Sequence, residues 1–209
     1  MSAVISATCC CGSIGRPDLR QCPVDFRLWR GDVRLTGVNR VVGAIMPTDW
    51  SKISPEVLEN ARNRGQEVDA LFCSYAAGTL KVIPAGTRKD AIALFEKLMK
   101  WFDRQGFKSV QTQVLLGGED HGGIMDLRLD GMAVDLKATS KVEQSAIMQV
   151  AAYMDLDVKS DDAAILHVTE RIVEPRLVKL HQQDADDWQS ILAAWRVVQR
   201  RRPTKEGDE

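Results

Sequence analysis

The sequence has little of several features, and each shortage excludes a class of protein. No apolar run approaches the ~18 residues of a membrane span, so we expect no transmembrane segment. Residues 1–8 are mildly apolar but follow no basic segment, so we expect no signal peptide. The net charge is only −1, from 28 basic and 29 acidic residues, which excludes nucleic-acid binding through a global positive charge. Any contact with nucleic acid therefore requires a local patch.

Cysteine is scarce and poorly placed for disulfides. The five cysteines are an odd number, and three of them, Cys9, Cys10 and Cys11, are consecutive. Adjacent cysteines seldom form a disulfide framework, so we expect a reducing compartment. With Cys22 they could hold a metal ion or an iron–sulfur cluster, but they lack the CxxC spacing that wraps one ion. A partly disordered N-terminal segment is the favoured interpretation.

The chain contains enough apolar residues for one full-sized core. Its 209 residues, 44% of them hydrophobic, are typical of a single globular domain. Glycine and proline interrupt residues 1–23, so we expect that segment to be irregular. The prediction is one domain over 24–202, with an N-terminal hairpin and helices over 24–86 and a core over 87–202. A disordered tail is expected over 203–209.

The spacing of apolar residues predicts an α/β fold. Alternation around Gly31-Asp32 predicts a hairpin over 26–35, and Ser54 before Pro55 predicts the start of a capped helix. We expect helices over 38–46, 54–75, 87–102, 143–157 and 184–201, and further strands over 107–116, 123–129, 132–138, 163–168 and 173–180. The core order is therefore helix, three strands, helix, two strands, helix.

One predicted hairpin carries the most specific chemistry. Asp130-Gly131 separates two alternating runs, which is a strong hairpin signal. With these residues as the turn, one face of the hairpin is apolar and faces the core; its predicted pairs are Leu129 with Met132, Leu127 with Val134, and Met125 with Leu136. The other face places Asp126 opposite Asp135, and Ile124 opposite Lys137.

Two carboxylates directly opposite each other destabilise a strand pair unless a cation offsets them. Hard divalent ions such as Mg²⁺ bind carboxylate oxygens. Lys137, on the same face as Asp135, could place its ammonium group near a metal-bound water or a scissile phosphate. The alternative is an exposed face on which Asp126, Arg128 and Lys137 are simply solvated.

The next helix adds a second pair of polar residues. Gln149 and Tyr153 are four residues apart, so they share a helix face. The Tyr153 hydroxyl and the Gln149 amide could contact a phosphate or a site residue. The alternative is an ordinary amphipathic helix, with Tyr153 at the edge of the core and Gln149 solvated.

Taken together, Gly123-x-x-Asp126, Asp135-x-Lys137 and Gln149-x-x-x-Tyr153 resemble the PD-(D/E)xK nuclease superfamily. The last motif is typical of its RecB-like exonuclease branch, and residues 135–153 look especially like the mitochondrial genome maintenance exonuclease and phage exonucleases. The resemblance implies a restriction-endonuclease-like core: a central mixed β-sheet flanked by helices. It also implies a Mg²⁺- or Mn²⁺-dependent deoxyribonuclease that hydrolyses phosphodiester bonds from DNA ends, preferring single strands. Such enzymes act in recombination, repair or genome maintenance, here in a bacterial or phage-infected cytoplasm.

The same resemblance assigns roles to residues. Asp126, Asp135 and the backbone carbonyl of Leu136 would hold one or two metal ions. Lys137 would orient the attacking water and stabilise the charge that develops on the phosphate. Gln149 and Tyr153 would position the strand.

Three departures from the family pattern stand out. A histidine ligand often follows an Arg-Gly by four residues, but here Asp69 occupies that place, and an aspartate can also bind a hard cation. A glutamate on the first core strand is replaced by Gln113 or, in another alignment, Gln111. Family members with an iron–sulfur cluster have three cysteines near the C-terminus, whereas no cysteine follows Cys73 here, so no cluster is expected.

Nucleic-acid contacts are predicted before the first motif and between the second and the third. Arg62 and Arg64 share a helix with Asp69, and Ser140 and Lys141 follow the Lys137 strand. Three tryptophans, Trp29, Trp50 and Trp101, could stack on bases, although core packing is the commoner role. The basic C-terminal cluster, Arg196, Arg200, Arg201, Arg202 and Lys205, is more typical of a solvated helix end than of a DNA-binding surface.

Two other functions remain open at the level of sequence. A structure-selective endonuclease that cuts flaps or junctions would use the same residues. A nuclease-fold module that binds nucleic acid without cleaving it would retain the fold but lose the chemistry. The presence of Asp126, Asp135 and Lys137 favours an active enzyme, and the sequence makes no prediction of oligomeric state.

Overall fold

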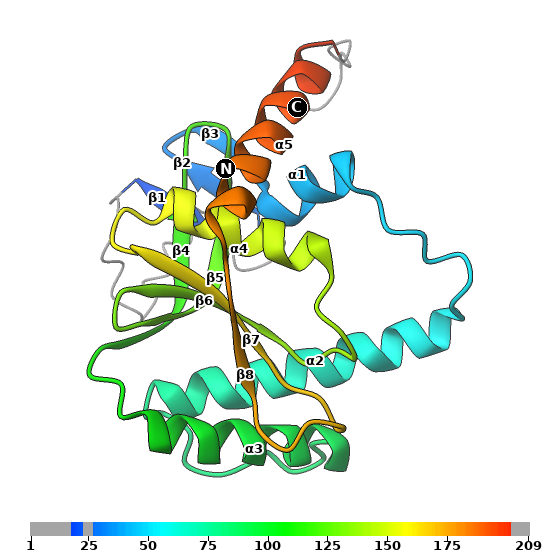
Figure 1. Ribbon diagram of the computed structural model, residues 1–209, viewed down its shortest axis with the longest axis vertical. Helices are drawn as coiled ribbons and strands as arrows, with labels where there is room; N and C mark the ends of the chain where they lie inside the picture. Colours follow the sequence, from blue (N-terminus) through cyan, green and yellow to red (C-terminus); the bar gives the residue numbers. More distant parts are fainter. Residues whose placement is uncertain (1–17, 23–26, 202–209) are drawn as a thin grey trace, which may run out of the picture.

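A computed structural model describes residues 18–22 and 27–201 (Figure 1). The consecutive cysteines Cys9–Cys11 and the expected tail over 203–209 lie outside the described residues. The elements in chain order are β1 (Leu19–Gln21), β2 (Leu28–Arg30), β3 (Val33–Gly37), α1 (Val38–Ile45), α2 (Pro55–Ala76), α3 (Lys89–Gln105), β4 (Val110–Gly117), β5 (His121–Leu129), β6 (Met132–Lys137), α4 (Gln144–Leu156), β7 (Asp162–His167), β8 (Arg176–Lys179) and α5 (Gln182–Arg201).

The strands form one mixed sheet in the order β1-β2-β3-β5-β6-β7-β8, with β4 also paired to β5. The pairs β3–β5 and β6–β7 are parallel, and the others are antiparallel. Helices α1, α4 and α5 lie on one side of the sheet, and α2 and α3 lie on the other (Figure 1). The predicted fold class, a central mixed sheet flanked by helices, is therefore confirmed.

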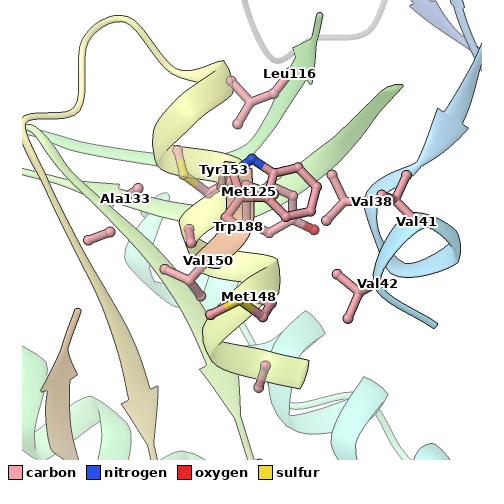
Figure 2. Close-up of a cluster of buried hydrophobic side chains, with 14 of the residues drawn as sticks. Val38, Val41, Val42, Leu116, Met125, Ala133, Met148, Val150, Tyr153 and Trp188 are labelled. Carbon is pink, nitrogen blue, oxygen red and sulfur yellow. The ribbon is translucent and has the colours of Figure 1, made fainter. Parts of the chain in front are cut away.

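Each side of the sheet has its own apolar core. On the side of α4, Trp188 of α5 is fully buried among residues of α1 and α4, among them Val38, Val42 and Met148 (Figure 2). On the other side, α2 and α3 pack residues such as Phe72 against Leu127, Leu129 and Val134 of the sheet. Burial of apolar side chains on both faces of the sheet holds β5 and β6 in the middle of the domain.

Local sequence signals explain several of these elements. The Ser54 hydroxyl accepts a hydrogen bond from the Val57 N–H at 3.3 Å, and Pro55 opens α2, as the sequence predicted. Asp130 and Gly131 have φ values of +48° and +85°, which is the left-handed conformation that a two-residue hairpin turn requires. Within residues 18–22 and 27–201, no helix is both long and apolar enough to span a membrane.

The N-terminal region differs from the prediction in one respect. Leu19–Gln21, expected to be irregular, forms strand β1 and pairs with β2. The hairpin of β2 and β3 presents an outer edge with unpaired backbone groups, and β1 satisfies them. The hairpin thereby becomes part of a three-stranded extension of the main sheet.

The predicted register of β5 and β6 is correct at the turn and wrong beyond it. The observed pairs are Leu129 with Met132, Arg128 with Ala133, and Leu127 with Val134. The ladder then ends, so Asp126 and Asp135 are not a cross-strand pair. Instead, the Leu136 N–H donates to the Asp126 side chain, with 2.8 Å between N and Oδ2.

A distortion in β4 lies opposite the point where the β5–β6 ladder ends. Gln113 has φ +51°, and the Gln113–Asp126 pair is missing from an otherwise continuous β4–β5 register. As a consequence, Met125 packs in the core beside α4, whereas Leu127 packs beside α2 and α3. The prediction that both share one apolar face is therefore wrong.

Candidate active site

The sheet itself opens where the predicted site residues lie. One edge of β5 pairs with β3 at His121 and Gly122, and with β6 from Leu127 onward. Along the described part of the chain, that edge of β5 has no strand partner between Gly123 and Asp126. A cavity of about 570 Å³ occupies this opening; its lining includes Asp69, Asp126, Asp135, Lys137, Gln149 and Tyr153.

Three carboxylates reach the cavity from three different elements. Asp69 comes from α2, Asp126 from β5 and Asp135 from β6. Burial raises the pKa of all three carboxyl groups, that of Asp126 well above its usual range. The negative charge of Asp135 raises the pKa of both Asp69 and Asp126 further. The site therefore concentrates negative charge in a poorly solvated space.

Lys137 is the cation that faces this charge. Its Nζ lies 2.6 Å from Asp135 Oδ2, although that oxygen makes no well-angled hydrogen bond, and 3.1 Å from Gln149 Oε1. Burial on its own would lower the pKa of Lys137, but the nearby carboxylates outweigh it and raise that pKa. Lys137 thus joins the β6 carboxylate to helix α4.

Gln149 and Tyr153 continue the same chain of contacts. The Gln149 amide donates to the Tyr153 hydroxyl at 2.9 Å, and both side chains are buried. The shared helix face predicted for this pair is therefore turned toward the site. Burial, followed by the charge of Asp135, raises the pKa of the Tyr153 hydroxyl, so it remains protonated and can act as a hydrogen-bond donor.

Sequence reasoning missed Cys73. Its Sγ lies 3.2 Å from Asp69 Oδ1 and 3.7 Å from the Asp126 carbonyl oxygen, and Gln113 Nε2 donates to it at 3.3 Å. Burial, then the charges of Asp69 and Asp126, raise the pKa of the thiol, so Cys73 stays neutral. The sequence signal that could have identified Cys73 is its spacing of four residues from Asp69, which places both side chains on one face of α2. Gln113 and Gln111 were the two residues predicted to occupy the position of a glutamate in the resembling family. Gln113 lies at the site beside Cys73, whereas Gln111 contacts Arg128.

The donor set fits a hard divalent cation. Asp69, Asp126 and Asp135 offer oxygen ligands, and the charge of Lys137 partly offsets theirs. The buried Asp135 Oδ2 lies 2.6 Å from the Lys137 ammonium but makes no well-angled hydrogen bond, so it can still accept a metal ion. Within the described ranges, no group of three His, Cys, Asp or Glu residues converges tightly enough to define a metal position. The residues thus suit the ion chemically, and the Leu136 carbonyl remains a predicted ligand.

The predicted nucleic-acid contacts lie in different surroundings. Arg62, Ser140 and Lys141 are exposed, and Lys141 pairs with Glu143 at 3.0 Å. Arg64 has partners within the chain, since its Nη1 lies 2.8 Å from Glu170 Oε1. Their role in binding DNA stays a prediction.

The three tryptophans predicted as possible base-stacking residues differ in their solvent exposure. Trp101 is buried in the core beside α2 and α3. Trp29 is half-buried, with the Arg20 guanidinium 5.9 Å from its ring centre. Trp50 is the exposed one, with 53% of its surface accessible.

Comparison with protein-family models gives no match, and no curated protein matches the sequence. Among solved structures, the chain is similar to a protein from Eubacterium rectale named "Putative exonuclease", with a TM-score of 0.49, 17% identity, and coverage of 79% of this chain and 80% of that one. It is also similar to the alkaline exonuclease LHK-Exo from Laribacter hongkongensis, with a TM-score of 0.46, 12% identity, and coverage of 78% and 87%. The complex of LHK-Exo with dAMP gives a TM-score of 0.45, 12% identity and the same coverages of 78% and 87%. These structural neighbours carry exonuclease names.

Proposed function

We propose that this protein is a metal-dependent deoxyribonuclease that shortens DNA from its ends and prefers single strands. The observation that carries the proposal is the meeting of Asp69, Asp126, Asp135 and Lys137 in one cavity in the opening of the sheet. Burial and mutual repulsion perturb the pKa values of these carboxyl groups, and perturbed acidic groups in a cleft are typical of catalytic sites. Recombination, repair or genome maintenance in a bacterial or phage-infected cytoplasm is the setting that we propose for this activity.

The carboxylates would hold Mg²⁺ or Mn²⁺, and we propose that the Leu136 carbonyl completes the shell. The ion would supply Lewis-acid activation of the phosphate and a water of lowered pKa. In this scheme the Leu136 N–H has a separate task. It holds the Asp126 carboxylate in place through the 2.8 Å hydrogen bond to Oδ2, which leaves Oδ1 for the metal ion.

Lys137 would act directly on the reacting groups. An ammonium group has three N–H donors, and Asp135 and Gln149 contact it from two directions. At least one donor therefore remains for the attacking water or for a phosphate oxygen that gains charge. Gln149 and Tyr153 would position Lys137. The hydrogen bond from the Gln149 amide to the Tyr153 hydroxyl fixes the amide group whose oxygen accepts from Lys137 Nζ.

The decisive experiment uses two forms of one single-stranded sequence. An end-labelled linear strand and a covalently closed circle are incubated with Mg²⁺, with Mn²⁺ or with EDTA. We expect shortening of the linear strand in either metal, an intact circle, and no reaction in EDTA. The position of the label that is lost first will give the polarity of digestion.

Other results would select the competing functions. Cutting of the circle would replace the exonuclease with an endonuclease, to be tested next on flap and junction substrates. Binding without cleavage of single-stranded, duplex, flap and RNA substrates would identify an inactive nucleic-acid-binding module and overturn the proposal.

A further inference from the structure

A second cavity adjoins the candidate active site. It has a volume of about 430 Å³ and shares Asn39, Lys137 and Gln149 with the first cavity. The two cavities therefore meet at Lys137, the residue proposed to contact the reacting phosphate. A polymer strand whose phosphate lies at Lys137 must place the neighbouring nucleoside on one side of it or the other.

The remaining walls of the second cavity combine an aromatic ring with short polar groups. The connection between α1 and α2, which includes Trp50, arcs along the same side of the molecule as the connection from β6 to α4 (Figure 1). Its lining residues include Trp50 and Met46, which have apolar side chains, and Thr48 and Ser145, which have hydroxyl groups. A lone exposed tryptophan is ordinary on a protein surface. This one differs because it lines a cavity that ends at Lys137.

This combination matches a nucleobase. A base presents a flat π-face that stacks on indole, and base–aromatic stacking tolerates any sequence because every base has such a face. Its polar edge can bond to side-chain amide and hydroxyl groups, and Asn39 and Ser145, which carry such groups, are among the lining residues. A base in a duplex already stacks on its neighbours and pairs along that edge, so only an unpaired base could occupy this space.

We infer that the cavity beside Trp50 is the subsite for the unpaired nucleoside next to the scissile phosphate. The inference rests on the proposed nuclease function and deepens it, since it gives a physical source for the preference for single strands. Trp50 would act there as a positioning residue that holds the strand while the phosphate lies at Lys137.

The test combines Trp50→Ala with abasic substrates. A series of linear single strands is used. Each strand carries one abasic nucleotide, at a different one of the first few positions from the attacked end. The first cleavage by wild-type protein should be slow only when the abasic position is the one that lies at Trp50 in the starting complex. Trp50→Ala should lower kcat/KM on the intact strand by about 5- to 100-fold and should lose this positional sensitivity. Trp50→Phe, which keeps an aromatic face, should restore most of the activity.

A matched control comes from the same region of the chain. Val57 lies in the first turn of α2 after the same connection, is 57% exposed and lies outside the lining of the cavity. Val57→Ala should leave both the rate and the abasic profile unchanged. Anisotropy of a labelled single strand in EDTA gives a second readout, in which Trp50→Ala weakens binding of the single strand more than that of a blunt duplex.

The outcomes distinguish failure of the proposed nuclease function from failure of the proposed subsite at Trp50. If wild-type protein cleaves no substrate, the proposed function fails. If wild-type protein cleaves but Trp50→Ala keeps the wild-type abasic profile, the subsite is wrong while the nuclease stands. A drop in melting temperature with that unchanged profile would show that Trp50 packs against its own chain, which also overturns the subsite.

Discussion

The ring of Tyr153 occupies the space that a side chain at position 123 would need. A Cβ atom on Gly123 would stand 2.6 Å from Tyr153 Cε1, closer than real contacts allow. The glycine on β5 thus lets helix α4 approach the opening in the sheet. This close approach brings Gln149 within 3.1 Å of Lys137.

Gly123→Ala should therefore damage both stability and activity. Overpacking of this kind costs about 1–3 kcal/mol, and a displaced Tyr153 would move Gln149 away from Lys137. Chemical denaturation and cleavage of a linear single strand would measure the two effects. Gly65 in α2 has open space at its Cβ position, so Gly65→Ala should instead gain up to about 1 kcal/mol of stability. Equal effects of the two substitutions on stability would contradict the proposed clash.

Lys137→Ala should abolish most cleavage while the protein remains folded. The side chain lies outside both apolar cores, and loss of one donor to a developing charge costs roughly a hundredfold to a thousandfold in rate. Cleavage rates and circular dichroism give the two readouts. Lys179→Ala is the matched control, because that lysine lies on β8 and forms a surface ion pair with Asp162 of β7. A Lys137→Ala variant that cuts as fast as wild type would remove Lys137 from the reaction.

Asp126→Asn should stabilise the protein in EDTA and eliminate its activity. The substitution removes one of three neighbouring negative charges, and the amide oxygen can still accept from the Leu136 N–H. Each kcal/mol gained should raise the melting temperature by about 2–4 °C for a domain of this size. Added Mg²⁺ should stabilise wild type more than the variant, because the variant has one carboxylate fewer to bind it. A lower melting temperature of the variant in EDTA would argue against repulsion among the carboxylates.

The Asp120–Arg196 ion pair should make stability fall in acid. Arg196 Nε lies 2.7 Å from Asp120 Oδ2, and this contact, helped by His121, lowers the pKa of Asp120 to about 2. A lowered carboxyl pKa contributes stability above the pKa of the unfolded chain, and that contribution is lost as the pH falls from about 4 toward 2. Because the pair is partly exposed, we expect only about 1 kcal/mol. Asp120→Asn should lower stability at pH 7 and have little effect near pH 2, as measured by urea denaturation at both values. A difference that persists at the lower pH would assign the effect to packing.

Much of the local structure could be predicted from the sequence because it depends on short-range spacing. Apolar periodicity marked the main helices and strands, Ser54 and Pro55 marked the start of α2, and Asp130-Gly131 marked the hairpin turn. The four-residue spacing of Gln149 and Tyr153 placed them on one face because a helix repeats about every 3.6 residues.

Contacts between distant segments were decided by the tertiary structure alone. The opening of β5 and β6 beyond Leu127 coincides with the distorted backbone at Gln113 on a third strand, which no pattern within the hairpin could reveal. Cys73 joins the site because α2 packs across the sheet, and Trp50 comes to line a cavity with Lys137 because α1 packs beside α4. Periodicity says which face of an element is buried, and the packing of whole elements decides which buried faces meet.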